Sequence, residues 1–160
     1  MGAVGGGAGL VGLWKAFREL AALGWLENGK LPRLIAVQSK GCATLVKAFG
    51  ARASFSDFWT NAHSIAPGLC IPKSFADHLI LHDLYDSNGL AVSVIDEAIL
   101  AAQQQFVEVE KISSSLEGAA TAAALAKLVR EKCVLPEERI VLLNTGSGPK
   151  NTHTTAKIVK

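Results

Sequence analysis

Residues 4–10 read Val-Gly-Gly-Gly-Ala-Gly-Leu and constrain this chain more than any other stretch. Four of the five residues from Gly5 to Gly9 lack a Cβ atom, so their backbone N–H groups are accessible and the chain can adopt positive φ. An amphipathic helical pattern follows at once, and its amino end adds free N–H groups and a positive dipole end. A strand stub, a glycine loop and a helix start together predict a site for an anion such as phosphate.

The glycine run does not match two common phosphate-binding motifs. Leu10 occupies the third glycine position of the dinucleotide-binding pattern, and no acidic residue ends the next predicted strand near Gln38. No Gly-Lys-Ser/Thr follows, which excludes a Walker loop. The remaining alternative for a glycine-rich stretch is a flexible N-terminal leader. The helical pattern that starts directly after Gly9 argues against a leader.

Composition and charge indicate one globular domain. The chain has 160 residues, of which 49% are hydrophobic and 19% charged, enough to bury a core. A net charge of +2 gives no electrostatic reason to expect nucleic acid or an anionic membrane. No apolar run is long enough to span a bilayer. Three cysteines without a secretory signal predict free thiols in a reducing cytoplasm.

Helical and strand patterns alternate along the chain. The expected helices cover residues 10–23, 42–49, 76–87, 96–105 and 118–132, and the expected strands cover 2–4, 33–38, 90–94 and 139–144. Within these helices, Leu79 and Val129 are expected on the buried side, and Asp96 is expected to cap its own helix. The pattern predicts an α/β fold with an open, mainly parallel sheet of about four strands and helices on both faces. Residues 1–150 form this single domain, and 151–160 form a polar tail.

Two glycine loops, 5–9 and 146–148, each follow a predicted strand directly. If the strands are parallel, both loops open on the carboxyl edge of the sheet, where ligands bind in folds of this class. The sequence therefore predicts one shared anion or cofactor site.

Six segments resemble, in the same order, segments of the threonine synthases. That family belongs to the tryptophan-synthase-β-like, fold type II group of pyridoxal-phosphate-dependent enzymes. The matching segments are 4–17, 31–38, 65–72, 96–102, 117–121 and 144–150. The resemblance covers nearly all of residues 3–151 and implies part of the fold type II large domain, with pyridoxal phosphate as the cofactor.

The resemblance also implies roles for individual residues. Gly5, Gly6, Gly7, Ala8 and Gly9 would hold the cofactor's phosphate. Thr145 would place its hydroxyl against the pyridine nitrogen, which a neutral partner keeps largely unprotonated. Glu117 would lie near the ring side of the cleft. From the residues alone, Thr145 is a turn residue and Glu117 a partner of the helix dipole.

The departures from the family bear on activity. The lysine to which the family attaches its cofactor is expected in an N-terminal half outside these residues, and only Lys150 lies near the cofactor end of the sheet. Leu116 and Pro149 replace a proline and a leucine usual in the family. We expect the cofactor-binding portion of a threonine-synthase-like lyase of threonine biosynthesis, inactive alone, with a complementary half or a homo-oligomer as partner. The alternatives are a non-catalytic module for phosphorylated ligands and an oligomer-forming remnant.

Other candidate groups lack a supporting pattern. His78 and His82 are four residues apart on one helix, but no third ligand is placed by spacing, so no metal site is predicted. His63 and Cys70 flank Pro67-Gly68 and could form a nucleophilic pair, although nothing sets their geometry. Ser147 lies between two glycines without the pattern of a nucleophile elbow.

Overall fold

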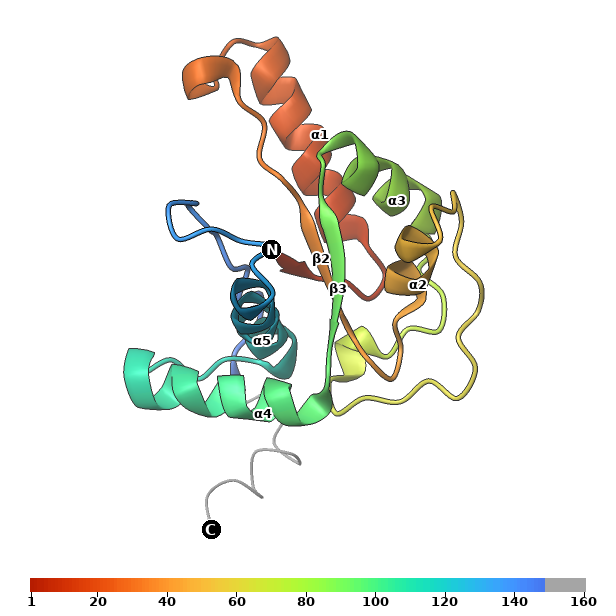
Figure 1. Ribbon diagram of the computed structural model, residues 1–160, viewed down its shortest axis with the longest axis vertical. Helices are drawn as coiled ribbons and strands as arrows, with labels where there is room; N and C mark the ends of the chain where they lie inside the picture. Colours follow the sequence, from red (N-terminus) through yellow and green to blue (C-terminus); the bar gives the residue numbers. More distant parts are fainter. Residues whose placement is uncertain (149–160) are drawn as a thin grey trace.

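The computed structural model describes residues 1–148 and contains a three-stranded parallel sheet (Figure 1). The strands are β1 (Gly2–Ala3), β2 (Ile35–Ser39) and β3 (Leu90–Val94), in the spatial order β1-β2-β3. In the register, Ala36 lies opposite both Gly2 and Ala91. Every residue of the central strand β2 is buried. A parallel strand covered on both faces explains the nearly continuous apolar run seen in the sequence.

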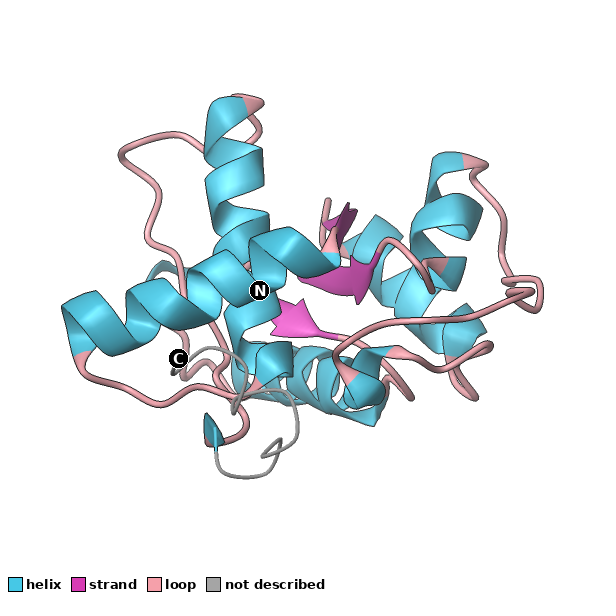
Figure 2. Cartoon of the chain, turned by 90° about the horizontal axis from the view of Figure 1, so that it is seen from below, coloured by secondary structure: helices cyan, strands magenta, loops and turns pink. Residues whose placement is uncertain are grey.

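Helices cover both faces of the sheet, as the alternating pattern predicted (Figures 1 and 2). On one face lie α1 (Ala8–Ala22), α2 (Thr44–Gly50) and α3 (Asp77–Asp86). On the other lie α4 (Asp96–Gln105) and α5 (Leu116–Arg130). Short 3-10 turns form at Glu27–Gly29 and Pro67–Leu69, and a π-helical turn, Phe106–Glu110, extends α4. Among residues 1–148 no helix is both long and apolar enough to cross a bilayer.

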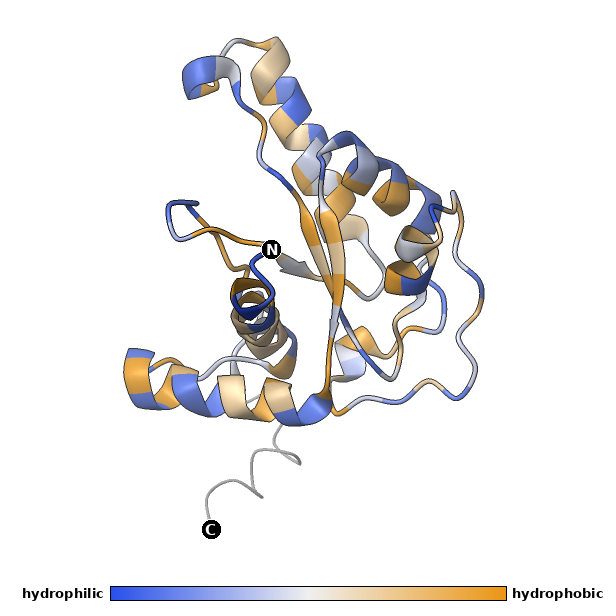
Figure 3. Ribbon diagram, in the orientation of Figure 1, coloured by the Kyte–Doolittle hydropathy of each residue, from blue (hydrophilic) through white to orange (hydrophobic). Residues whose placement is uncertain are grey.

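Two apolar cores sit on opposite sides of β2. Ala36 packs with Trp14 and Ile80 from α1 and α3, while its neighbour Val37 packs with Ile99 and Leu116 on the other side. Successive strand residues point to opposite faces, so one short strand serves both cores. Figure 3 shows the resulting apolar band along β2 and β3.

The expected fourth strand at 139–144 is not formed. Two hydrogen bonds join this segment to Met1: the Met1 amine donates to the Val141 carbonyl at 2.8 Å, and the Leu143 amide donates to the Met1 carbonyl at 3.1 Å. The segment therefore runs beside β1, but β1 itself has only two residues to pair with. The sheet has three strands because this edge offers too short a ladder for another.

Two side chains expected on buried helix faces are exposed. Leu79 is 44% exposed and Val129 is 53% exposed. In α3 the buried apolar residues are Ile80, Leu81 and Leu84, so the face that meets the sheet begins one position after Leu79. The local pattern predicted the helices and their approximate ends, whereas the packing angle against the sheet decided which edge of each apolar stripe is covered.

Candidate functional site

The glycine loop joins β1 to α1 at the carboxyl end of the sheet (Figure 1). Gly7 is the N-cap of α1 and has φ of 97°, a conformation that strains residues with a side chain. A Cβ atom at Gly7 would lie 2.1 Å from Cδ1 of Ile80, and one at Gly5 would lie 2.0 Å from the Gly68 carbonyl oxygen. Both positions therefore require glycine.

Helix α1 begins at Ala8, two residues earlier than the sequence predicted. Ala8 and Gly9 thus belong to its first turn, where backbone N–H groups have no partner within the helix. Both residues are exposed. The first turn carries no acidic side chain that could occupy these N–H groups.

The backbone N–H groups from Gly5 to Gly9 have no hydrogen-bond acceptor among residues 1–148. The amides on either side are paired: Val4 donates to the Val37 carbonyl at 2.8 Å, and Leu10 donates to the Gly7 carbonyl at 3.1 Å. Five consecutive free donors at a helix amino end suit an anion with several oxygen atoms.

Two polar side chains hold the carbonyl groups of this loop. Gln38, buried at the end of β2, donates from Nε2 to the Val4 carbonyl at 3.4 Å. Its Oε1 accepts from the Leu45 amide at 2.9 Å and so also fixes the first turn of α2. The buried Ser74 hydroxyl donates to the Gly5 carbonyl. These two hydrogen bonds fix the carbonyls of Val4 and Gly5 and leave the amides of Gly5 to Gly9 free to bind a ligand.

The turn Pro67–Leu69 lies between the glycine loop and α5. The Gly68 amide donates to Oε1 of Glu117 at 3.0 Å, and the Gly68 carbonyl faces Gly5. A Cβ atom at Gly68 would lie 2.8 Å from the same Glu117 oxygen. Glu117 thus holds the turn that closes over the glycine loop, in addition to lying in the first turn of α5.

Residues 144–148 lie against the amino end of α5. Ser115, the N-cap of α5, accepts from the Gly118 amide at 3.1 Å, and its own amide donates to the Gly146 carbonyl at 2.9 Å. Oδ1 of Asn144 accepts from the Ser114 hydroxyl at 3.0 Å. Thr145, between Asn144 and Gly146, is exposed there.

The predicted site residues therefore form a continuous row along one edge of the sheet. Gly5 contacts Gly68, Gly68 contacts Glu117, and the neighbouring Gly118 lies against Asn144, next to Thr145. The two glycine loops are linked through Gly68, Glu117 and Gly118, although the strand expected before the second loop is not formed. The roles of these residues toward a cofactor stay predictions.

Asp96 does not cap its own helix, contrary to the sequence-based expectation. It is the first residue of α4, and the N-cap position belongs to Ile95. The Asp96 carboxylate instead accepts from the Ser39 hydroxyl at 3.2 Å, the Ser64 hydroxyl at 3.0 Å and the Ile65 amide at 3.1 Å. It fastens the segment leading to Gly68 onto the end of β2, because the loop 51–66 returns to that point.

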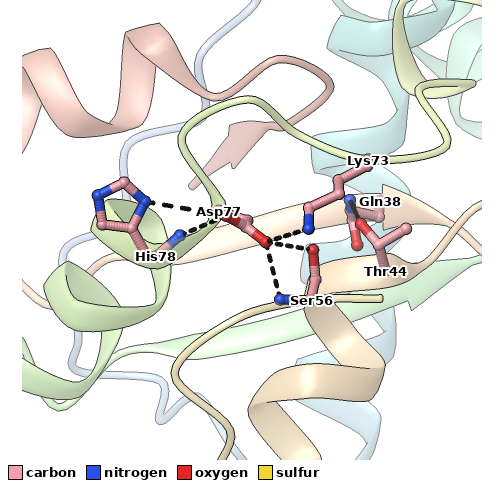
Figure 4. A network of polar contacts seen from close by, with 6 residues as sticks. All are labelled: Gln38, Thr44, Ser56, Lys73, Asp77 and His78. Atoms are coloured by element: carbon pink, nitrogen blue, oxygen red, sulfur yellow. Dashed lines mark hydrogen bonds and ion pairs between the residues drawn. The ribbon is translucent and has the colours of Figure 1, made fainter. Parts of the chain in front are cut away.

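Another carboxylate, that of the buried Asp77, anchors the other end of the long loop (Figure 4). Asp77 accepts from the amide and hydroxyl of Ser56, both at 2.8 Å, and from the His78 amide at 2.8 Å, with Lys73 Nζ at 3.8 Å. Burial opposes ionisation of Asp77, but the hydrogen bonds and Lys73 outweigh it and hold its pKa below the usual value. This network ties Lys73, the residue before Ser74, to the first residue of α3.

The remaining candidates from the sequence do not form sites. His63 Nδ1 lies 2.9 Å from the Asn61 carbonyl, and Cys70 is a half-buried free cysteine. Ser147 pairs with Ser114 in an isolated β-bridge. His78 and His82 each lie beside an aspartate, and residues 1–148 contain no cluster of three potential metal ligands. Lys150 lies outside the described residues.

Sequence reasoning missed four residues that position the site: Gln38, Ser74, Asp77 and Asp96. Gln38 lies near the end of β2, Asp77 and Asp96 are the first residues of α3 and α4, and Ser74 lies in the loop before α3. These locations are a usable signal, since a buried polar side chain there must find a partner in a neighbouring segment.

The fold and this row of residues define the class of protein to which the chain belongs. Residues 1–146 match the family described as pyridoxal-phosphate-dependent enzymes, so the chain belongs to that family. It is 32% identical over 148 residues to a threonine synthase from Methanocaldococcus jannaschii, covering 92% of this chain and 36% of the relative. It is 30% identical to a threonine synthase from Methanosarcina acetivorans, covering 97% of this chain and 38% of the relative. The chain thus spans well under half the length of these relatives.

Solved structures share the fold. A threonine deaminase isoform from Solanum lycopersicum superimposes with a TM-score of 0.71 at 17% identity, covering 98% of this chain and 43% of that one. Maize serine racemase superimposes with a TM-score of 0.63 at 21% identity, covering 98% of this chain and 46% of that one. These neighbours are fold type II pyridoxal-phosphate enzymes, and the identification of that fold from sequence is confirmed.

Proposed function

We propose that the glycine loop and the start of α1 bind the phosphate group of pyridoxal phosphate, as the phosphate-binding part of a threonine-synthase-like enzyme. The observation that carries the proposal is the set of five free N–H groups from Gly5 to Gly9. The site fits this group because Gly5 and Gly7 leave no room for side chains and no carboxylate competes in the first turn. Membership of the pyridoxal-phosphate family supports the same ligand.

Each residue of the row has a distinct role in this proposal. The amides of Gly5 to Gly9 donate to the phosphate oxygens, and the dipole of α1 favours their charge. Glu117 holds the Gly68 turn against the loop and thereby shapes the ring side of the site. The Thr145 hydroxyl donates to the pyridine nitrogen and leaves it uncharged. The cofactor, when bound, supplies an electron-withdrawing ring for reactions at an amino acid's α-carbon.

We further propose that this chain alone, in the cytoplasm, does not turn over substrate. Ser74 contacts the glycine loop, and the next residue back along the chain is Lys73. The Lys73 Nζ lies 3.8 Å from the Asp77 carboxylate and 5.5 Å from the centre of the Phe58 ring. That ammonium group is therefore already paired with a carboxylate and an aromatic ring. Phosphate release from O-phosphohomoserine by the purified chain would contradict this part of the proposal.

The site is tested with pyridoxine 5′-phosphate, which has the ring and phosphate but no aldehyde to react with surface lysines. Calorimetric titration is expected to give saturable binding that pyridoxine, without the phosphate, does not give. Gly5→Ala should weaken binding at least about tenfold, because the new methyl group displaces the Gly68 carbonyl. Gly12→Ala in α1, where a Cβ meets nothing within 4 Å, is the matched control. Equal affinities for the two variants would overturn the assignment.

The alternative is a non-catalytic module for phosphorylated ligands, favoured by the engagement of Lys73 elsewhere. The two functions differ in their ligand requirement. A cofactor site prefers pyridoxine 5′-phosphate over inorganic phosphate, whereas a general phosphate site binds both with similar affinity through the same amides. The same titration with inorganic phosphate separates them.

We also propose that the remaining part of the family's length, on the same or another polypeptide, covers the edge of the sheet at β1. A cavity of 700 Å³ opens there, lined by apolar residues that include Met1, Leu13, Phe17 and Leu143 and by the charged residues Lys30, Arg33, Glu138 and Arg139. A mainly apolar cavity beside a sheet edge favours association. Light scattering of this chain alone should show a homo-oligomer. When a polypeptide that carries the rest of the family's length is added, a mixed complex of the two chains should form instead. A monomer in both samples would contradict the proposal.

A further inference from the structure

Phe75 is a large aromatic side chain that stays exposed beside the glycine loop. Its exposed fraction is 76%, while the residues on either side, Ser74 and Ala76, are buried. A Cβ atom at Gly6 would lie 3.6 Å from Cε1 and 3.7 Å from Cδ1 of this ring. Among residues 1–148 these are the only atoms within 4 Å of that position, apart from the chain neighbours of Gly6. The Phe75 ring therefore flanks the loop at Gly6.

The backbone around Phe75 is held on both sides. The Ser74 hydroxyl donates to the Gly5 carbonyl and so ties the preceding residue to the loop itself. Ala76 is the N-cap of α3, and its carbonyl accepts from the Ile80 amide at 3.0 Å. A side chain that is fixed at its backbone and exposed at its ring loses little freedom when a ligand binds against it.

The other surroundings of the loop differ from Phe75. A Cβ at Gly7 would meet Ile80, whose side chain is fully buried. A Cβ at Gly9 would meet nothing within 4 Å. The loop thus borders the core at Gly7, open space at Gly9, and an exposed aromatic ring at Gly6.

The ring is also close to one of the five free N–H groups. The Gly6 nitrogen is two bonds from the Cβ position, so Cε1 of Phe75 lies within about 7 Å of that nitrogen. An oxygen atom that accepts from this N–H lies about 3 Å from the nitrogen. A phosphate group bound there brings its ester oxygen and the attached carbon within reach of the ring.

We propose that Phe75 is a specificity-determining residue of the glycine-loop site, whose ring packs against the organic part of a phosphate monoester. This inference rests on the proposed phosphate site. The amides of Gly5 to Gly9 bind phosphate oxygens whether the ligand is an ester or the free ion. The ring, in contrast, stabilises only the ester, because burying carbon atoms against it removes apolar surface from water. Phe75 thereby raises the affinity for esters above that for inorganic phosphate.

Exposed aromatic side chains also serve as contacts for other chains. Phe58 is exposed to the same degree, at 75%, but its ring lies 5.5 Å from the Lys73 ammonium group. The contact with Gly6 distinguishes Phe75 from Phe58 and favours a ligand of the loop as its partner. Phe58 is therefore a matched control.

The test compares two affinities in each protein. Pyridoxine 5′-phosphate and inorganic phosphate are titrated by calorimetry into the complete chain as wild type, Phe75→Ala and Phe58→Ala. Phe75→Ala should weaken binding of the ester about tenfold and change binding of inorganic phosphate less than about twofold, because only carbon atoms lose a contact. Phe58→Ala should keep both wild-type affinities. Phe75→Leu retains an apolar side chain and should recover most of the loss.

Thermal unfolding separates a lost contact from lost structure. Since the ring is exposed, Phe75→Ala and Phe58→Ala should both unfold near the wild-type Tm. Fluorescence gives a further readout that does not depend on affinity. Phe75→Trp puts a fluorophore beside Gly6, and saturating pyridoxine 5′-phosphate should change its emission beyond the change in wild type. Phe58→Trp should show no such additional change.

The outcomes distinguish this inference from the proposed function. If the ratio of ester affinity to phosphate affinity is the same in Phe75→Ala as in wild type, Phe75 does not select the ligand, and the phosphate site stands. Emission of Phe75→Trp that does not respond to the bound ester would overturn the inference in the same way. A wild-type chain that binds neither ligand would overturn both the inference and the proposed function.

Discussion

The backbone amide of Gly68 donates a 3.0 Å hydrogen bond to Oε1 of Glu117, across 49 positions of sequence. This bond connects the turn over the glycine loop with the amino end of α5. Because the Gly68 carbonyl also packs against Gly5, one residue transmits the position of α5 to the glycine loop. The candidate site is therefore built from three segments that hold one another, rather than from the glycine loop alone.

Removing the Glu117 side chain should loosen this arrangement. We expect Glu117→Ala to lower the free energy of unfolding by about 1 kcal/mol and to weaken binding of pyridoxine 5′-phosphate. Chemical denaturation and calorimetric titration measure the two effects. Glu117→Gln keeps an acceptor for the Gly68 amide and is the matched control. If the alanine variant binds as well as the glutamine variant, Glu117 does not shape the site.

Gly7 should tolerate no side chain. Gly7→Ala must place a methyl group 2.1 Å from Ile80 Cδ1, at a φ of 97°. Strain and overpacking together should lower the free energy of unfolding by about 2–4 kcal/mol, which thermal unfolding detects as a fall of several degrees in Tm. Gly9→Ala, with open space around the new Cβ, should be at least as stable as wild type. A Gly7→Ala protein as stable as Gly9→Ala would contradict the loop geometry.

Asp96 should stabilise the segment before Gly68. In Asp96→Ala the Ser39 and Ser64 hydroxyls and the Ile65 amide lose a shared acceptor, so we expect a loss of about 2–3 kcal/mol. Hydrogen exchange should become faster in residues 64–70. The adjacent Glu97 is exposed, and Glu97→Ala serves as the control. Equal exchange rates in the two variants would show that the segment is held by other contacts.

Asp77 should make the free energy of unfolding fall as the pH is lowered. Its pKa in the folded chain lies below the ordinary value of 3.8, so the unfolded chain binds the proton first as the pH falls. The stability that Asp77 contributes is fully present well above pH 3.8 and is lost as the pH falls below it.

The measurement for Asp77 is thermal unfolding of wild type and Asp77→Asn across pH. The difference in Tm should be largest near about pH 6 and should narrow below about pH 4. Asp57→Asn, at a side chain that is 89% exposed, should follow wild type at every pH. A difference between wild type and Asp77→Asn that stays constant down to pH 3 would contradict the role of the carboxylate charge.

Local patterns were sufficient for much of the fold. Strand β3 occupies residues 90–94 as predicted. The predicted ends of the five helices lie within about two residues of the observed ends. Alternation of these elements predicted the parallel sheet and the helices on both faces. The number of strands was wrong, since whether residues 139–144 join the sheet depends on how many residues the edge strand offers.

The sequence by itself determined the order of helices and strands and the glycine positions, because apolar period and missing Cβ atoms act over a few neighbouring residues. Only the tertiary structure decided that Gly68 separates the glycine loop from Glu117, and that Asp96 and Gln38 fasten loops rather than their own elements. Those hydrogen bonds join residues 31 or more positions apart. Their partners are set by which segments the packed sheet brings to one edge, and no local pattern encodes that.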